Sequence, residues 1–146
     1  MISVQIQDFD MATEYRNLIK HSASGAIVTF VGRVRDFQQG DKQFLLQHYP
    51  GMTEKVLGDI EKKAHDHWPL LATTIIHRVG ELHVNDQIVF VGVSSEHRKA
   101  AFEACEFMID VLKTHAPFWK KEGGHWVEAK QQDQDAADAW LTPSQK

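Results

Sequence analysis

Residues 97–122 read HRKAAFEACEFMIDVLKTHAPFWKKE and predict one long helix with cationic residues near both of its ends. Apolar residues recur at helical spacing along one face, opposite a stripe of Lys, Glu and Asp. Pro117 is expected to end the helix, and Ser94 or Ser95 to cap its start. The protein carries a formal net charge of −4, so the cationic cluster is not part of a generally basic surface. The pattern indicates a local site for an anionic ligand.

Several of the cationic positions also have a purely structural interpretation. Lys113, in the last turn of the predicted helix, complements the helix dipole and can pair with Asp110 one turn earlier. Lys120 and Lys121 can be solvated loop residues, although the aromatic residues before them suggest that this segment packs against the protein. These residues therefore indicate an anion site only in combination.

The cations at the start of the helix are harder to explain structurally. His97 and Arg98 lie in the first turn, where free backbone N–H groups already favour an anion and cations are mildly unfavourable. Phosphate binding gives a reason for their presence. Arg33 and Arg35 end the apolar segment 26–34 and lie two positions apart, so they share one face of a strand. They are either a charged strand end or the rim of the anion site.

The rest of the sequence predicts an α+β fold. A length of 146 residues with 42% apolar residues suits a single domain. Strands are expected at 4–7, 26–34, 44–49, 73–79, 87–93 and 125–130, and further helices at 13–20, at 52–68 and at 131–140, the last anchored by Trp140. The strands at 73–79 and 87–93 should form an antiparallel hairpin with a short excursion between them. Strict βαβ alternation is lacking, which favours an α+β arrangement.

Composition excludes several classes of protein. Lys and Arg number 16 against 20 Asp and Glu, which argues against nucleic-acid binding through a broad basic face. Residues 1–11 lack the features of a signal peptide and no apolar run approaches ~18 residues, so a cytoplasmic protein is expected. The single cysteine, Cys105, excludes an internal disulfide and is expected to be a buried, inert thiol. Metal-ligand spacings and Gly-rich phosphate loops are missing, so neither a metal site nor a cofactor is expected.

Five ordered motifs resemble the large, catalytic subunit of molybdopterin synthase, the MoaE family. They are TFVGRVRD at 29–36, HYPGM at 48–52, IHRVGEL at 76–82, IVFVGVSSEHRKAAFEA at 88–104 and LKTHAPFWKKE at 112–122. The resemblance implies one α+β domain over residues 1–140, with a mixed, mainly antiparallel sheet and packed helices in an α/β-hammerhead-like arrangement. Residues 141–146 would form a flexible C-terminal tail.

The resemblance also implies a sulfurtransferase of molybdenum cofactor biosynthesis. A small ubiquitin-like partner subunit would donate sulfur from its C-terminal Gly-Gly thiocarboxylate. The acceptor would be cyclic pyranopterin monophosphate, which becomes the dithiolene of molybdopterin. Two large subunits would pair as the core of a heterotetramer. The alternative is a non-catalytic docking module that binds a ubiquitin-like tail and transforms no small molecule.

Family functional positions fall on nine residues of this sequence. The resemblance makes Lys113 and Lys120 the catalytic residues, with Lys113 the first choice for direct chemistry. Arg35, His97 and Arg98 would hold the substrate phosphate and the polar edge of the pterin, since guanidinium groups and helix-start amides suit phosphate oxygens. The full substrate-binding set is Arg33, Val34, Arg35, His97, Arg98, Lys113, Lys120, Lys121 and Glu122.

Helix geometry adds a constraint on this set. Arg98 and Lys113 are fifteen positions apart, which corresponds to roughly 22 Å along a continuous helix at ~1.5 Å per residue. A monophosphorylated pterin does not easily touch both ends of that span. The simplest arrangement takes Lys113 from one subunit and His97 with Arg98 from its dimer mate. The family often has arginine at the position of Lys130, so the role of Lys130 stays open.

Overall fold

The computed structural model describes residues 1–35, 43–122, 125–127, 135 and 138–140. In these parts of the chain, helices and strands alternate without strict βαβ order. The elements are β1 (Ile2–Gln5), α1 (Met11–Leu18), β2 (Ala26–Arg33), β3 (Gln43–His48), α2 (Met52–His67), β4 (Leu70–Arg78), β5 (Gly80–His83), β6 (Gln87–Ser95), α3 (Arg98–His115), β7 (Phe118–Glu122) and β8 (His125–Val127).

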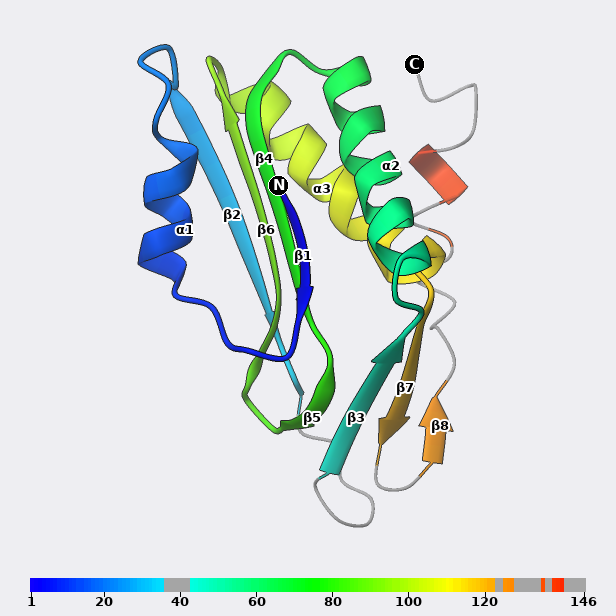
Figure 1. Cartoon of the computed structure of the whole chain (residues 1–146). Helices are drawn as coiled ribbons and strands as arrows, with labels where there is room; N and C mark the ends of the chain where they lie inside the picture. Colours follow the sequence, from blue (N-terminus) through cyan, green and yellow to red (C-terminus); the bar gives the residue numbers. More distant parts are fainter. Residues whose placement is uncertain (36–42, 123–124, 128–134, 136–137, 141–146) are drawn as a thin grey trace.

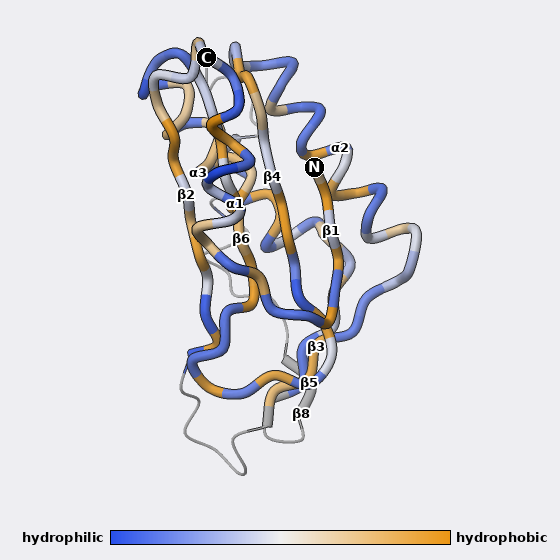
Figure 2. Tube along the Cα trace, turned by 60° about the vertical axis from the view of Figure 1, so that its left-hand side comes forward, coloured by the Kyte–Doolittle hydropathy of each residue, from blue (hydrophilic) through white to orange (hydrophobic). Residues whose placement is uncertain are grey.

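The first sheet has the strand order β1-β4-β6-β2. β4 and β2 both pair antiparallel with β6, which confirms the predicted hairpin, whereas β1 pairs parallel with β4. α2 and α3 lie on one face of this sheet and α1 lies on the other (Figure 1). Parts of the central strands β4 and β6 are hydrophobic, as Figure 2 shows, because both of their faces are covered by helices.

The largest core lies between this sheet and the helices α2 and α3. It consists of the apolar faces that the helical periodicity predicted, together with inward residues of β4 and β6. Trp68 follows α2, packs against Phe107 with ring centroids 5.3 Å apart, and precedes Pro69, which confirms the predicted end of this helix. Trp140 donates a 2.7 Å hydrogen bond from Nε1 to Asp110 Oδ2, so it anchors the described end of the chain as expected.

The second sheet has the order β5-β3-β7-β8, and its described pairings are antiparallel. The chain passes from the first sheet into the second between Arg78 and Gly80, where Gly80 has a φ of +93°. Glycine adopts that conformation without steric strain, so the change of sheet needs only one intervening residue. A smaller core joins the two sheets and contains Val34, Phe44, Leu46, Val79 and Leu82, with Phe118 packed against it. The fold is α+β with mainly antiparallel sheets, as predicted.

The structure corrects several element boundaries. β1 and α1 each begin two residues earlier than predicted. Both strands of the hairpin are longer than predicted: β4 begins at Leu70 and β6 ends at Ser95. The predicted cap of α3 is wrong. Ser94 and Ser95 are buried in β6, and the residue before the helix is His97, whose backbone N–H donates to Ser95 Oγ at 3.3 Å.

One interpretation of Lys120 and Lys121 was that they are solvated residues of a loop. The segment after Pro117 is not a loop. It forms β7, which pairs with β3 along its whole length. The predicted strand at 125–130 is confirmed for His125–Val127, and residues 128–130 lie outside the described residues. The predicted terminal helix is described only at 135 and 138–140, where it is helical, and residues 141–146 also lie outside the described part.

Candidate active site

The predicted catalytic residue Lys120 lies in the middle of β7 and pairs with Leu46 of β3. Residues paired across antiparallel strands point to the same face, and alternate residues of one strand share a face. Lys120 therefore shares its face with Leu46, which is buried, and with Phe118, which packs against the smaller core. Lys121 pairs with Leu45 on the opposite face. The structure thus separates these two lysines, which the sequence had grouped together.

His77 is a buried histidine on the first sheet that lies beneath β7. Its ring stacks on Phe118 with centroids 4.0 Å apart and an interplanar angle of 25°, and 6% of the residue is exposed. The Nδ1 atom lies 2.9 Å from the carbonyl oxygen of Arg78. A carbonyl only accepts hydrogen bonds, so Nδ1 carries the proton and Nε2 is left as an acceptor.

Burial lowers the pKa of His77 to about 4. The hydrogen bond to the carbonyl of Arg78 opposes this change, whereas the charges of Lys120 and His48 lower the pKa further. His77 is therefore neutral at physiological pH and close enough to Lys120 to sense its charge. Sequence reasoning assigned it no role, although a histidine within the apolar strand at 73–79 was a visible signal.

Lys113 lies in the last turn of α3 and is exposed, as predicted. The helix ends at His115, and Ala116 and Pro117 lead directly into β7. Thr53, at the start of α2, is buried and donates from Oγ1 to the carbonyl oxygen of Pro117 at 3.1 Å. This contact ties to α2 the junction between α3, which carries Lys113, and β7, which carries Lys120.

The segment Arg33–Arg35 lies at the smaller core, which joins the two sheets. Val34 is buried in the smaller core, and its backbone N–H donates to the carbonyl oxygen of Asp86 at 2.9 Å. Arg33 and Arg35 are exposed on either side of Val34, as alternation predicted, although β2 itself ends at Arg33. The guanidinium of Arg33 donates from Nε to the carbonyl oxygen of Asn85 at 3.0 Å. The backbone of the remaining predicted residue, Glu122, pairs with Phe44 of this core.

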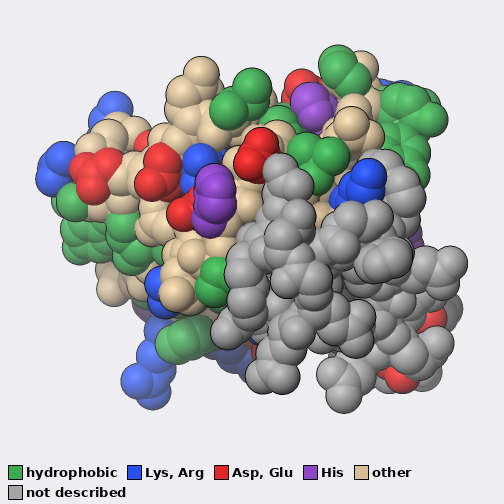
Figure 3. Space-filling model, turned by 90° about the horizontal axis from the view of Figure 1, so that it is seen from below, with side chains coloured by type: hydrophobic (Ala, Val, Ile, Leu, Met, Phe, Trp, Pro, Cys, Tyr) green, Lys and Arg blue, Asp and Glu red, His purple; other side chains and the backbone are tan. Residues whose placement is uncertain are grey.

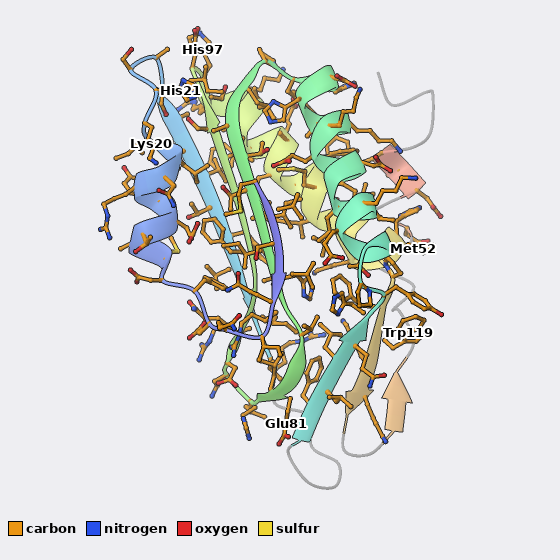
Figure 4. The ribbon with its side chains drawn as sticks, in the orientation of Figure 1. Lys20, His21, Met52, Glu81, His97 and Trp119 are labelled. Carbon is orange, nitrogen blue, oxygen red and sulfur yellow. The ribbon has the colours of Figure 1, made fainter. Side chains whose placement is uncertain are left out.

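His97 and Arg98 lie at the opposite end of α3 from Lys113. The helix is continuous from Arg98 to His115, so the predicted separation of roughly 22 Å applies. Figure 4 shows His97 at the top of the molecule and Trp119, the residue before Lys120, well below it on the other side. Within one chain the predicted site residues therefore form two groups, one at each end of α3.

A groove of about 650 Å³ opens beside the free end of β3. β5 pairs with β3 only up to Leu46, so the stretch from Gln47 onward is unpaired on that side among the described strands. Tyr49 and Trp119 are exposed at this groove and meet edge to face, with centroids 4.4 Å apart. The groove is lined by Ile6, Leu46, Gln47, His48, Tyr49, Val79, Gly80 and Trp119. None of the predicted site residues lines it, although Leu46 and Trp119 both adjoin Lys120.

The surface around the second sheet is mixed in charge. Seen from that end of the molecule, acidic, basic and histidine side chains are interspersed with hydrophobic ones (Figure 3). Among the residues that the structure describes, no three His, Cys, Asp or Glu side chains converge on a metal site. In the same part of the chain, no helix is long and apolar enough to cross a membrane.

Comparison with known proteins decides the family. The family model described as MoaE protein matches residues 4–115. The chain belongs to the MoaE family. A relative from Vibrio cholerae serotype O1, named molybdopterin synthase catalytic subunit, is 52% identical over 145 residues, which cover 95% of this chain and 97% of that protein.

Solved structures of MoaE proteins share the fold. The molybdopterin biosynthesis MoaE protein from Burkholderia ambifaria superposes with a TM-score of 0.83 at 45% identity, covering 97% of this chain and 99% of that one. The crystal structure of molybdopterin synthase from Staphylococcus aureus gives a TM-score of 0.79 at 34% identity, covering 86% and 96%. The Burkholderia ambifaria structure covers nearly the whole chain, so its match includes the second sheet that carries Lys120.

Proposed function

We propose that this chain is the catalytic subunit of a molybdopterin synthase. The observation that carries the proposal is the 52% identity, over nearly the whole of both chains, with a relative of that name. The reaction moves sulfur from the C-terminal thiocarboxylate of a small partner subunit to cyclic pyranopterin monophosphate. Two transfers create the dithiolene of molybdopterin, and each leaves an ordinary carboxylate on the partner's tail.

The chemistry of Cys105 supports a sulfur source outside this chain. The thiol is buried and lies 3.9 Å from the carbonyl oxygen of Val91, to which it donates. Burial raises the pKa of Cys105 to about 12, and the charge of Glu106 adds to the effect. A thiol that stays protonated and inaccessible at neutral pH is neither a nucleophile nor a sulfur carrier. The partner's thiocarboxylate supplies the sulfur instead.

Lys113 and Lys120 are the residues proposed to act on the reacting groups. They lie on consecutive elements, and the core beneath Lys120 also holds the segment Arg33–Arg35. A lysine can bind the thiocarboxylate as an ammonium, or accept a proton or attack carbon as an amine. Lys121 and Glu122, on the same strand, complete the proposed substrate-binding set; because Lys121 lies on the opposite face of β7 from Lys120, it would contact substrate from that other face.

The substrate phosphate is proposed to lie at His97 and Arg98 of a second subunit. These residues are exposed at the start of α3, where the free N–H groups of the first turn add to the positive charge of Arg98. Because about 22 Å separates them from Lys113 in the same chain, a complete site needs two copies. The assembly would be a dimer of this chain with one small subunit bound to each copy, working in the cytoplasm. Residues 1–140 would form the catalytic domain, followed by the short tail 141–146.

The groove beside β3 supports a docking place for the partner's extended tail. Its volume of about 650 Å³ is within the range of ordinary ligand sites, and one of its exposed aromatic residues, Trp119, lies next to Lys120 on β7. The docking-module alternative uses this groove equally well. The two functions differ only in whether a small molecule is converted.

Reconstitution distinguishes the two functions. The chain is mixed with a thiocarboxylated small subunit and cyclic pyranopterin monophosphate, and the dithiolene product is measured. Wild-type protein should turn over only with the thiocarboxylated partner. Lys113→Ala and Lys120→Ala should each lower the rate by about 10² to 10⁴, the usual contribution of one acid or base, while the complex still assembles.

Lys63→Ala serves as the matched control, because Lys63 is an exposed lysine of α2 that belongs neither to the proposed catalytic pair nor to the proposed substrate-binding set. Its turnover should equal that of wild type. Product formation at normal rates in both Lys113→Ala and Lys120→Ala would remove the catalytic assignment of these lysines. A wild-type complex that assembles and forms no product would instead support the docking module.

A further inference from the structure

His77 places a polar ring at a position of β4 where its neighbours are apolar. Its partners on the adjacent strands are Val4 of β1 and Val89 of β6, and both pack in the large core. Ile75, two positions earlier on β4 and therefore on the same face, is completely buried in that core. An apolar residue would avoid the cost of burying a polar group here, so the imidazole needs a reason other than packing.

One nitrogen of the His77 ring is an open acceptor. Nδ1 donates to the carbonyl oxygen of Arg78 at 2.9 Å, whereas no residue of the described chain donates to Nε2. Among the described residues that are not exposed, Glu14 Oε1 is the one side-chain polar atom that is shielded from solvent and lacks a partner. Nε2 therefore keeps a small accessible surface, and it is available to a mobile donor beside it.

Lys120 is a donor that can reach this acceptor. The His77 ring stacks on Phe118 with centroids 4.0 Å apart. Lys120 follows Phe118 by two positions on the same face of β7, about 7 Å further at ~3.3 Å per residue. The long, flexible side chain of lysine spans such a distance. The effect of the Lys120 charge on the pKa of His77 agrees with this proximity.

The other charged or titratable groups near His77 are engaged elsewhere. His48 of β3 has its Nε2 atom 3.9 Å from Glu54 Oε2. Arg78 follows His77 on β4, so its side chain leaves the strand on the opposite face, where it donates to backbone carbonyl oxygens at 3.1 and 2.9 Å. Lys120 is therefore the donor that the arrangement offers to Nε2.

We propose that His77 is a positioning residue for Lys120, whose amine donates a hydrogen bond to His77 Nε2 directly or through one water. The inference rests on the proposed function, in which Lys120 acts on the reacting groups. An acceptor-only nitrogen meets an N–H of the lysine and never its lone pair. The remaining N–H groups of an ammonium, or the lone pair of a neutral amine, are therefore directed away from the core, toward the thiocarboxylate and the precursor.

The surroundings of His77 suit this role. Because burial lowers its pKa to about 4, the ring is neutral at neutral pH, keeps the lone pair of Nε2 and adds no positive charge beside Lys120. The hydrogen bond from Nδ1 to the carbonyl of Arg78 fixes the tautomer, and the stacking on Phe118 fixes the plane of the ring. The acceptor is thus held in place before the substrate binds.

Two variants separate a positioning role from a purely structural one. His77→Phe keeps an aromatic ring against Phe118 and removes the acceptor, whereas His77→Gln loses the ring and retains an acceptor oxygen. Positioning predicts that His77→Phe lowers kcat by about 10- to 100-fold, the cost of a misplaced reacting group, with little change in KM for the precursor. His77→Gln should keep most of the wild-type kcat, although urea unfolding should show it to be the less stable of the two.

The opposite order, with His77→Phe the more active variant, would overturn the positioning role. A double-mutant cycle adds a second check. In the Lys120→Ala background, His77→Phe should have little further effect on kcat, because its effect operates through that lysine. Losses that multiply in the double variant would show that His77 acts independently of Lys120, and the proposal would fail.

Nitrogen NMR of the His77 ring tests the contact without turnover. Nδ1 should carry the proton, and Lys120→Ala should shift the Nε2 signal while Nδ1 stays nearly unchanged. An Nε2 signal that is indifferent to Lys120→Ala overturns the contact, whether or not sulfur is transferred. A wild-type chain that shows the contact and forms no product with the thiocarboxylated partner and the precursor overturns the proposed function instead.

Discussion

The buried neutral His77 makes the stability of this protein sensitive to mild acid. Its pKa is lowered by burial from the usual value near 6.5 to about 4 in the folded chain. Between these two values the unfolded chain binds a proton that the folded chain does not, so stability falls as the pH falls from about 6.5 to about 4. Below about pH 4 both states are protonated and the loss levels off.

The size of the effect follows from the two pKa values. A difference of roughly 2.5 pH units, at about 1.4 kcal/mol per unit, corresponds to a loss of about 3 to 4 kcal/mol. That is a large part of the ~5–15 kcal/mol of a typical domain. The carboxyl groups of Asp8 and Asp10 do not produce this loss. Hydrogen bonds from Gln87 and Thr13, respectively, lower their pKa values below 3.8, so their contribution is lost mainly at lower pH.

Urea unfolding at pH 7, 6, 5 and 4.5, followed by tryptophan fluorescence, measures this loss. His77→Asn is the matched variant, because its side-chain amide can still donate to the carbonyl of Arg78 and does not titrate. We expect it to be less stable than wild type at pH 7, since it loses the stacking on Phe118. Its stability should nevertheless change much less between pH 6.5 and 4.5. Parallel curves for the two proteins over that range would refute the assignment of the acid sensitivity to His77.

Two further expectations concern the site and the thiol. Mixing inactive Arg98→Ala and Lys113→Ala proteins under conditions of subunit exchange should restore activity, approaching one intact composite site per mixed dimer; verified mixed dimers as inactive as either parent would show that both residues act within one subunit. Cys105→Ala should keep near-wild-type turnover while losing on the order of 1 kcal/mol of stability, and the native thiol should react with thiol reagents only after unfolding. Loss of turnover in a folded, partner-binding Cys105→Ala protein would contradict the purely structural role of this residue.

Local patterns were enough to predict most elements of this fold. The apolar periodicity of residues 52–68 and 97–115, together with Pro69 and Pro117, predicted α2 and α3 nearly to the residue. The apolar segments that became β2, β4 and β6 were equally clear, because a covered strand must be apolar on both faces. Cys105 lay within such a pattern, and its burial followed from helix geometry. The distance between Arg98 and Lys113 could likewise be predicted from the sequence, because it depends only on their being in one continuous helix.

The relations between elements came only from the tertiary structure. β7 is a strand because it pairs with β3, about 70 residues earlier in the chain, and nothing in its own five residues specifies that partner. The same pairing places Lys120 above a buried core and Lys121 on the opposite face. The burial of His77 depends on Phe118 reaching it from another sheet. Strand pairing and burial depend on contacts between residues distant in sequence, whereas periodicity reports only the neighbours along one element. For that reason the sequence determined the elements and the site's residue types, and the tertiary structure decided which of those residues meet.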